Sequence, residues 1–264
     1  MPRKIIDSHI HLDLYTEEEQ SLILNSMKSN YIEGLINVSM HLQSAKRNLE
    51  LSNRHQKVYP AFGFHPEQTL PHEQDLEQLF KFIIQHKEDI VAIGEVGLPY
   101  YLRKELSELK LEPYIELLEE FILLAKKIDK PIVLHAIYDD ARIALDLLEK
   151  HSIKKAHFHW FKGDEKTLKH MAENGYYISI THDVLYKHKI EQIAQINTLD
   201  LLMVETDGPW PFEGPFKQQM THPKMIHESI RKIALLKNEA IETVYKQLYE
   251  NTKEFYLNKR KRET

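Results

Sequence analysis

The sequence contains no cysteine, and this absence excludes disulfide bonds and metal sites built from thiolates. Glycine is also scarce, with 8 residues in a chain of 264, and no G-x-G-x-x-G motif follows the first apolar run. Folds that bind dinucleotides through such a glycine-rich turn are therefore disfavoured.

Long apolar runs are missing as well. No stretch approaches the roughly 18 uninterrupted apolar residues of a membrane-spanning helix, and the first residues show no signal-peptide pattern. We expect a cytoplasmic protein with no membrane contact and no obligate protein partner evident. The net charge of −5 argues against a stoichiometric nucleic-acid coat, and the one basic cluster, KRKRET at 259–264, is expected to be a solvated tail.

What the sequence does contain is a series of short apolar or β-branched runs, which predict strands buried on both faces. These runs lie at 4–9, 34–40, 58–64, 90–96, 131–136, 155–160, 176–180 and 201–206. Segments of helical spacing separate them; one places Leu76, Leu79 and Ile83 on a single side. The alternation and the chain length predict an α/β fold, a (β/α)8 TIM barrel forming one domain over 1–264. An open doubly wound sheet is the alternative.

The first predicted strand ends in the stretch IIDSHIHLDL, which carries two histidines one residue apart. Because side chains alternate across a strand, His9 and His11 point to the same side. Two imidazoles on one face at a strand end can hold a metal ion. Polar strand-end residues in a histidine-rich chain are the structural alternative.

Five further strands also deliver a histidine or a carboxylate at their ends. These residues are His65, Glu95, His135, His159 and Asp207. Barrel active sites lie at the carboxyl ends of the strands, so we expect the seven groups to meet at one rim. Imidazoles and carboxylates together suit two divalent ions such as Zn, Mn or Mg, with Glu95 able to bridge them. Asp207 is placed to orient a water and take its proton.

Six motifs occur in order along nearly the whole chain. They are DSHIHLD, GFHPE, AIGEVGLPYY, PIVLHA, HFHWFKG and VETDGPWP. In these motifs the sequence resembles the TatD family of metal-dependent hydrolases, within the amidohydrolase-like barrels. The resemblance implies a barrel with two divalent ions and an activity like that of deoxyribonucleases that trim DNA from its 3′ end.

The resemblance also implies roles for individual residues. It assigns the first ion to His9, His11, Glu95 and Asp207, and the second to Glu95, His135 and His159. It further implies that His65 faces the substrate phosphate. We take Asp207 and Glu95 as the catalytic candidates and His65 and Trp160 as the substrate-binding candidates.

Several positions depart from the family pattern near the expected substrate. Pro99 replaces an Asp, Ala136 and Ile137 stand where an Arg is usual, and Met220 and Thr221 replace an Arg and an Asn. Bulky Trp160 and Phe161 occupy a loop that is usually small. These departures leave open whether nuclease activity is retained.

Three functions are therefore compared. The first is a two-metal phosphodiesterase acting on nucleic acid, in which Trp160, Trp210 and Phe212 stack bases, unless they only pack over the barrel mouth. The second is an amide, ester or lactone hydrolase acting on a small metabolite with the same ions. The third, a non-catalytic binding protein, is disfavoured because no expected metal ligand is lost.

Overall fold

The computed structural model describes residues 3–258, so the basic cluster at 259–264 lies outside the described residues. Eight parallel strands form one sheet whose spatial order follows the chain. The strands are β1 (Ile5–Ile10), β2 (Ile32–Val38), β3 (Val58–Phe62), β4 (Ala92–Gly97), β5 (Ile132–His135), β6 (Ala156–Phe158), β7 (Tyr177–Ile180) and β8 (Leu202–Val204). All eight predicted strands are confirmed, each to within two residues at either end.

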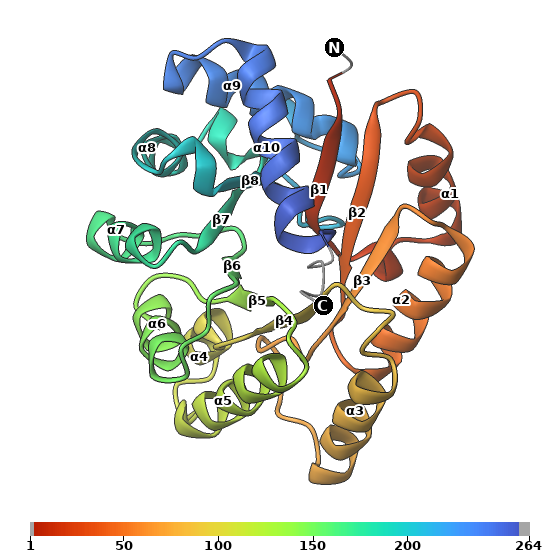
Figure 1. Ribbon diagram of the computed structural model, residues 1–264, viewed down its shortest axis with the longest axis vertical. Helices are drawn as coiled ribbons and strands as arrows, with labels where there is room; N and C mark the ends of the chain where they lie inside the picture. Colours follow the sequence, from red (N-terminus) through yellow and green to blue (C-terminus); the bar gives the residue numbers. More distant parts are fainter. Residues whose placement is uncertain (1–2, 259–264) are drawn as a thin grey trace, which may run out of the picture.

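Helices follow the strands and lie around the outside of the barrel (Figure 1). They are α1 (Glu17–Ser26), α2 (Leu42–Arg54), α3 (Glu73–Gln85), α4 (Tyr100–Glu105), α5 (Glu112–Lys127), α6 (Asp140–Lys150), α7 (Glu165–Glu173), α8 (His188–Ile196), α9 (Ile226–Lys237) and α10 (Ile241–Tyr256). In α3 the predicted apolar side is buried at Leu79 and Ile83. Within residues 3–258, no helix combines the length and apolar character needed to cross a membrane.

The barrel contains an apolar cluster to which most of its strands contribute. Its cluster consists of Ile6, Ile36, Val38, Ala61, Ala92, Val133 and Met203, closed by Phe255 and Tyr256 from the end of α10. Beside this cluster the interior becomes polar, because the Nδ1 and Nε2 atoms of His157 lie 2.5 Å from the Tyr256 hydroxyl and 2.7 Å from the Ser179 hydroxyl. The barrel interior therefore combines an apolar cluster with buried polar groups beside it.

The two ends of the sheet meet at the histidine motif. The backbone N–H of Asp207 donates to the His9 carbonyl at 2.9 Å, and the N–H of His11 donates to the Gly208 carbonyl at 2.8 Å. The Asp7 carboxylate also accepts bonds from the N–H of Thr206 at 3.0 Å and from its hydroxyl at 2.5 Å. These contacts fix the end of β1 against the segment that follows β8.

Candidate metal centre

Six side chains from five strands or strand ends meet at the carboxyl end of the barrel. They are His9, His11, Glu95, His135, His159 and Asp207, and all six are buried. His9, Glu95 and His135 lie within strands. His11 and His159 follow directly after β1 and β6, and Asp207 lies three residues after the end of β8. The structure thus brings together the residues that the sequence predicts as metal ligands.

Glu95 lies at the centre of this cluster, and its two oxygens face different histidines. Oε2 is 3.0 Å from His9 Nε2 and 3.2 Å from His11 Nε2. Oε1 is 3.0 Å from His135 Nδ1 and 2.6 Å from His159 Nε2. A carboxylate divided between two pairs of imidazoles has the arrangement expected of a group that bridges two ions.

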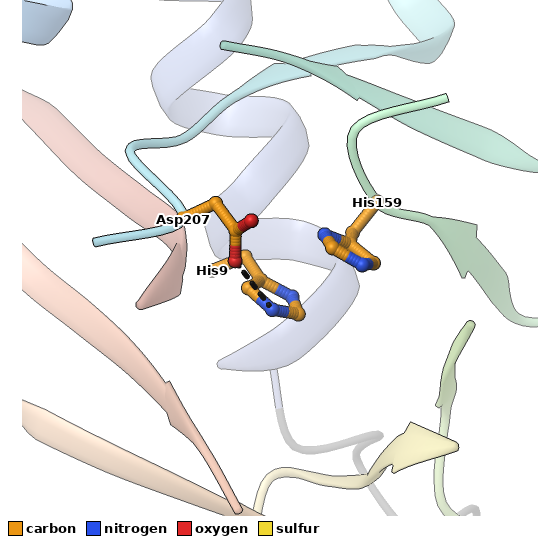
Figure 2. A group of neighbouring side chains, drawn as sticks. All are labelled: His9, His159 and Asp207. Carbon is orange, nitrogen blue, oxygen red and sulfur yellow. Dashed lines mark ion pairs between the residues drawn. The ribbon is translucent and has the colours of Figure 1, made fainter. Parts of the chain in front are cut away.

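Asp207 approaches the cluster from the end of β8. Its Oδ1 atom is 3.4 Å from His9 Nε2 and 3.5 Å from His11 Nε2. Figure 2 shows this carboxylate directed at the His9 ring, which stacks on the His159 ring with 3.8 Å between centroids. Asp207 has a φ of 51°, an unfavourable backbone region for a residue with a side chain, and such residues concentrate at functional sites.

The polar atoms of the cluster have too few protein partners. His11 Nε2 and Asp207 Oδ1 are buried without a hydrogen bond, as is the Nδ1 atom of His159. Leaving such groups unsatisfied costs about 1–3 kcal/mol each. Three sets of ligand atoms each lie within 4.8 Å of one another: His9, His159 and Asp207; His9, His11 and Glu95; and His65, Glu95 and His135. Imidazole and carboxylate ligands in this number fit divalent ions such as zinc or manganese.

The electrostatics keep both carboxylates of the cluster ionised. Burial alone would raise the pKa of Glu95, but the charges of the surrounding imidazoles, that of His159 foremost, hold it well below its usual range. Burial likewise opposes ionisation of Asp207, yet the His11 imidazole 3.5 Å from its Oδ1 atom and the nearby His159 and His9 rings lower its pKa. Ionised oxygens are the form in which carboxylates bind metal ions.

His65 lies at the edge of the same cluster. Its Nε2 atom is 3.4 Å from Glu95 Oε1, and its ring centroid is 5.0 Å from that of His135. It also lines the open cleft above the ligands. The predicted substrate-facing histidine therefore stands between the cleft and Glu95, within reach of both.

Glu67 is a site residue that sequence reasoning missed. Its Oε1 atom lies 3.1 Å from His135 Nε2, on the opposite side of the ring from Glu95. Its carboxylate also accepts bonds from the backbone N–H groups of Tyr101 and Leu102 at the start of α4. Such an outer carboxylate fixes the orientation of a metal-binding imidazole. The only signal in the sequence is its place two residues after His65.

Glu205 is a second residue that the sequence reasoning missed. Its two oxygens accept bonds from the Trp160 N–H at 2.7 Å and the Ser179 hydroxyl at 2.5 Å, and Oε1 lies 3.6 Å from His159 Nδ1. It therefore holds the loop that carries His159. The only signal in the sequence is its place two residues before Asp207.

A cleft of about 350 Å³ opens above the ligands. It is lined by His65, Glu67, Tyr101, His135, Ile137, His159, Trp160, Lys162, Asp207 and Trp210. A larger hollow of about 630 Å³ contacts Tyr59, Pro131 and Tyr256, but none of the six ligands lines it. The smaller cleft is thus the one of the two that His135, His159 and Asp207 line.

The aromatic residues of the rim have different positions. The Trp160 indole N–H donates to Asp183 at 3.0 Å, which fixes its ring at the cleft, and Trp210 is 42% exposed beside it. Phe212 is buried and packs against Trp160 and His182. Phe212 therefore supports the rim by packing and does not present its ring for stacking.

The positions that depart from the family pattern also have structural roles. Ile137 lines the cleft, and Ala136 beside it is buried. The Thr221 hydroxyl donates to the Trp210 carbonyl at 2.6 Å, and its own carbonyl accepts from Tyr15 at 2.8 Å. Thr221 thus holds the loop that carries Trp210 in place.

Comparison with known proteins gives relatives over almost the full chain. Residues 6–257 match the family described as TatD related DNase. An uncharacterized metal-dependent hydrolase from Haemophilus influenzae is 44% identical over 253 residues, covering 96% of this chain and 99% of the relative. The human deoxyribonuclease TATDN3 is 28% identical over 250 residues, covering 91% of this chain and 90% of the relative.

Solved structures agree on the fold. The TatD homologue YjjV from Escherichia coli superposes with a TM-score of 0.87 at 24% identity, covering 98% of this chain and 100% of the other. An Entamoeba histolytica hydrolase of the TatD family superposes with a TM-score of 0.84 at 20% identity, covering 97% of this chain and 99% of the other. From the family match and the 44% identical relative, this chain belongs to the TatD family of metal-dependent hydrolases.

Proposed function

We propose that this hydrolase cleaves phosphodiester bonds at the ends of nucleic acid strands with a water molecule and two divalent ions. The observation that carries the proposal is the division of Glu95, whose Oε2 faces one pair of histidines and whose Oε1 faces another. A pair of ions joined by one carboxylate is a common arrangement in enzymes that cleave phosphate esters.

The ligands divide between two positions. His9, His11, Glu95 and Asp207 would hold one ion, and Glu95, His135 and His159 the other. When bound, two such ions supply a Lewis acid for the phosphoryl oxygen and a lowered pKa for the attacking water. Asp207 lines the cleft, so its carboxylate is placed to orient that water and accept its proton. Glu67 and Glu205 keep the rings of His135 and His159 in place.

Two further observations support nucleic acid as the substrate. The rings of Trp160 and Trp210 line the cleft, where flat side chains can stack on bases. The human relative at 28% identity is described as a deoxyribonuclease. His65, at the boundary between the ligands and the cleft, is placed to contact the phosphate beside the scissile bond.

One observation favours a second candidate, an amide, ester or lactone hydrolase. Ile137 puts an apolar side chain into the cleft, and such a wall suits an uncharged metabolite. Both candidates use the same ligands, so they differ only in what the cleft accepts.

Hydrolysis of defined substrates separates the two candidates. Purified protein loaded with Zn, Mn or Mg is incubated with single-stranded DNA labelled at the 5′ or the 3′ end, and in parallel with ester, lactone and amide panels. We expect stepwise shortening of the DNA that is lost in Glu95→Gln. If only the ester, lactone or amide substrates are hydrolysed and the DNA stays intact, the second candidate replaces the first.

A further inference from the structure

Lys162 brings a positive charge to the wall of the cleft. It lies in the loop after β6, three residues beyond His159, and lines the same cleft as the ligands. Its ammonium nitrogen sits 3.8 Å from the centroid of the Trp160 ring and 3.1 Å from the Tyr101 hydroxyl. The side chain is therefore held by a ring and a hydroxyl at the point where a substrate would enter.

Two other cations of this region each pair with a carboxylate, whereas Lys162 does not among the residues that the structure describes. Lys187 pairs with Asp183 at 2.9 Å, and Arg103 pairs with Asp140. Within residues 3–258, Lys162 forms no ion pair with a carboxylate. Burial lowers the pKa of its ammonium group, so a bound anion would stabilise the charged form.

The nearest carboxylates act on Lys162 through their charges without forming an ion pair with it. Asp183, Asp207 and Glu205 raise the pKa of its ammonium group in this way, but Asp183 is engaged by Lys187 and by the Trp160 indole N–H. Glu67 is engaged by His135 and by two backbone N–H groups of α4, and Asp207 is directed at His9 and His11. The position of Lys162 is also fixed through its main chain, because its carbonyl accepts the N–H of Tyr138 at 2.5 Å. The loops after β5 and β6 thus present the cation together.

We propose that Lys162 binds a second phosphate group of the substrate, separate from the phosphate at the metal ligands, and so selects strand ends that carry a terminal phosphate. The inference rests on the proposed function, since it takes the first phosphate to be at the ligands. A nucleotide with its base beside Trp160 and Trp210 would place one phosphate over Glu95 and direct the other to the cleft wall.

The two tryptophans provide a direct readout of binding. The chain contains 2 Trp, and both line the cleft, so tryptophan fluorescence, excited selectively over tyrosine, reports on this site. Zinc-loaded protein is titrated with thymidine 5′-monophosphate and with thymidine 3′,5′-bisphosphate. The variants are Lys162→Met, which keeps the length of the side chain, and Lys162→Arg, which keeps its charge. The matched control is Lys104→Met, since Lys104 lies over the Tyr100 ring at 4.2 Å outside the cleft.

We expect the bisphosphate to bind about tenfold more tightly than the monophosphate, as one charge-assisted hydrogen bond would provide. This ratio should persist in Lys104→Met and Lys162→Arg and fall to near one in Lys162→Met. A ratio that survives in Lys162→Met, or a wild-type protein that does not distinguish the two ligands, overturns the proposal.

Turnover separates this inference from the proposed function. The dinucleotide d(TpT) and its phosphorylated forms d(pTpT) and d(TpTp) are compared by kcat and KM. We expect one phosphorylated form to have a lower KM in wild type and to lose that advantage in Lys162→Met, with kcat little changed. Equal KM values for all three overturn the role of Lys162 alone, whereas no hydrolysis of any of them overturns the phosphodiesterase function as well.

Discussion

Glu95 and Asp207 are both buried carboxylates, yet the structure surrounds them differently. Glu95 has imidazoles on both of its oxygens, whereas Asp207 approaches two imidazoles with Oδ1 alone. Loss of Glu95 should therefore affect both proposed ions. Loss of Asp207 should affect one ion and the proton transfer. These different consequences can be measured separately.

Replacing Glu95 with Gln should remove both ions and abolish hydrolysis, because the neutral amide cannot balance two cations in a buried site. Metal content after dialysis against buffer without added metal, measured by atomic emission, tests this expectation. Retention of two ions per chain with wild-type turnover would show that Glu95 does not bridge.

Asp207→Asn should keep the fold and, at saturating metal, much of the bound ion. Asn offers an oxygen of similar position but cannot accept a proton at neutral pH. Turnover should fall by about 10²–10⁴, the usual contribution of a positioned acid or base, with a smaller change in substrate affinity. If excess metal fully restores turnover, Asp207 is a ligand only.

His182 makes a prediction about acid stability. It is buried between Phe212 and Phe216, and its Nδ1 lies 2.8 Å from the Ser229 hydroxyl. Burial lowers its pKa from 6.5 to about 3, so the unfolded chain binds its proton first as pH falls. The neutral ring makes its full contribution to the free energy of unfolding above pH 6.5. This contribution is lost as the pH falls toward 3, and about 2 kcal/mol of it is lost between pH 6 and 4.

Urea unfolding of metal-free protein at pH 4, 5, 6 and 7 checks this expectation. Wild type and His182→Gln share all other titrating groups. The difference between their slopes of unfolding free energy against pH therefore isolates His182. Its contribution would be disproved by identical slopes in the two proteins.

Individual residues also show where the sequence was informative. Strand alternation and the shared rim of a barrel predict that seven groups meet at one place, and the family resemblance selects six of them as candidate metal ligands. Glu67 and Lys162 could not be chosen in this way, since each lies in a loop whose path depends on packing between neighbouring units. A loop carboxylate or lysine has the same local signature whether it faces solvent or a cleft.

Among the elements, β4 and β5 show how strand contact controls the site. Gly97 of β4 pairs with His135 of β5, and a Cβ at Gly97 would lie 1.9 Å from the His135 carbonyl oxygen. The strands were predictable from their apolar runs, whereas this close approach depends on the register between them. The short helix α4, which receives the Glu67 carboxylate, was likewise not apparent from periodicity.

Gly97→Ala should therefore push β5 away and displace His135. We expect destabilisation of about 3 kcal/mol and weaker binding of the ion assigned to His135 and His159, as measured by thermal unfolding and metal content. Gly175→Asn is the control, because nothing lies within 4 Å of a Cβ there and Asn tolerates its φ of 71°. Wild-type metal content in Gly97→Ala would refute the proposed link between the strand contact and the ligand.

For the whole molecule, the candidate ligand cluster connects five of the eight strands, so metal binding should stabilise the fold. At about 100 times the Kd, one ion adds about 2.7 kcal/mol to the free energy of unfolding. Removal of metal by EDTA should lower the Tm by about 5 °C or more in a chain of this size. Glu95→Gln should show little response to EDTA, and an unchanged Tm in wild type would contradict the prediction.

The contacts between the end of β1 and the segment after β8 have a consequence for biosynthesis. The Asp7 to Thr206 bonds join residues separated by 199 positions in the chain. A ribosome therefore releases His9 and His11 long before the carboxylate that completes their site. Since contacts of such long range form late, we expect the growing polypeptide to remain without a complete site until nearly all of the barrel has been translated.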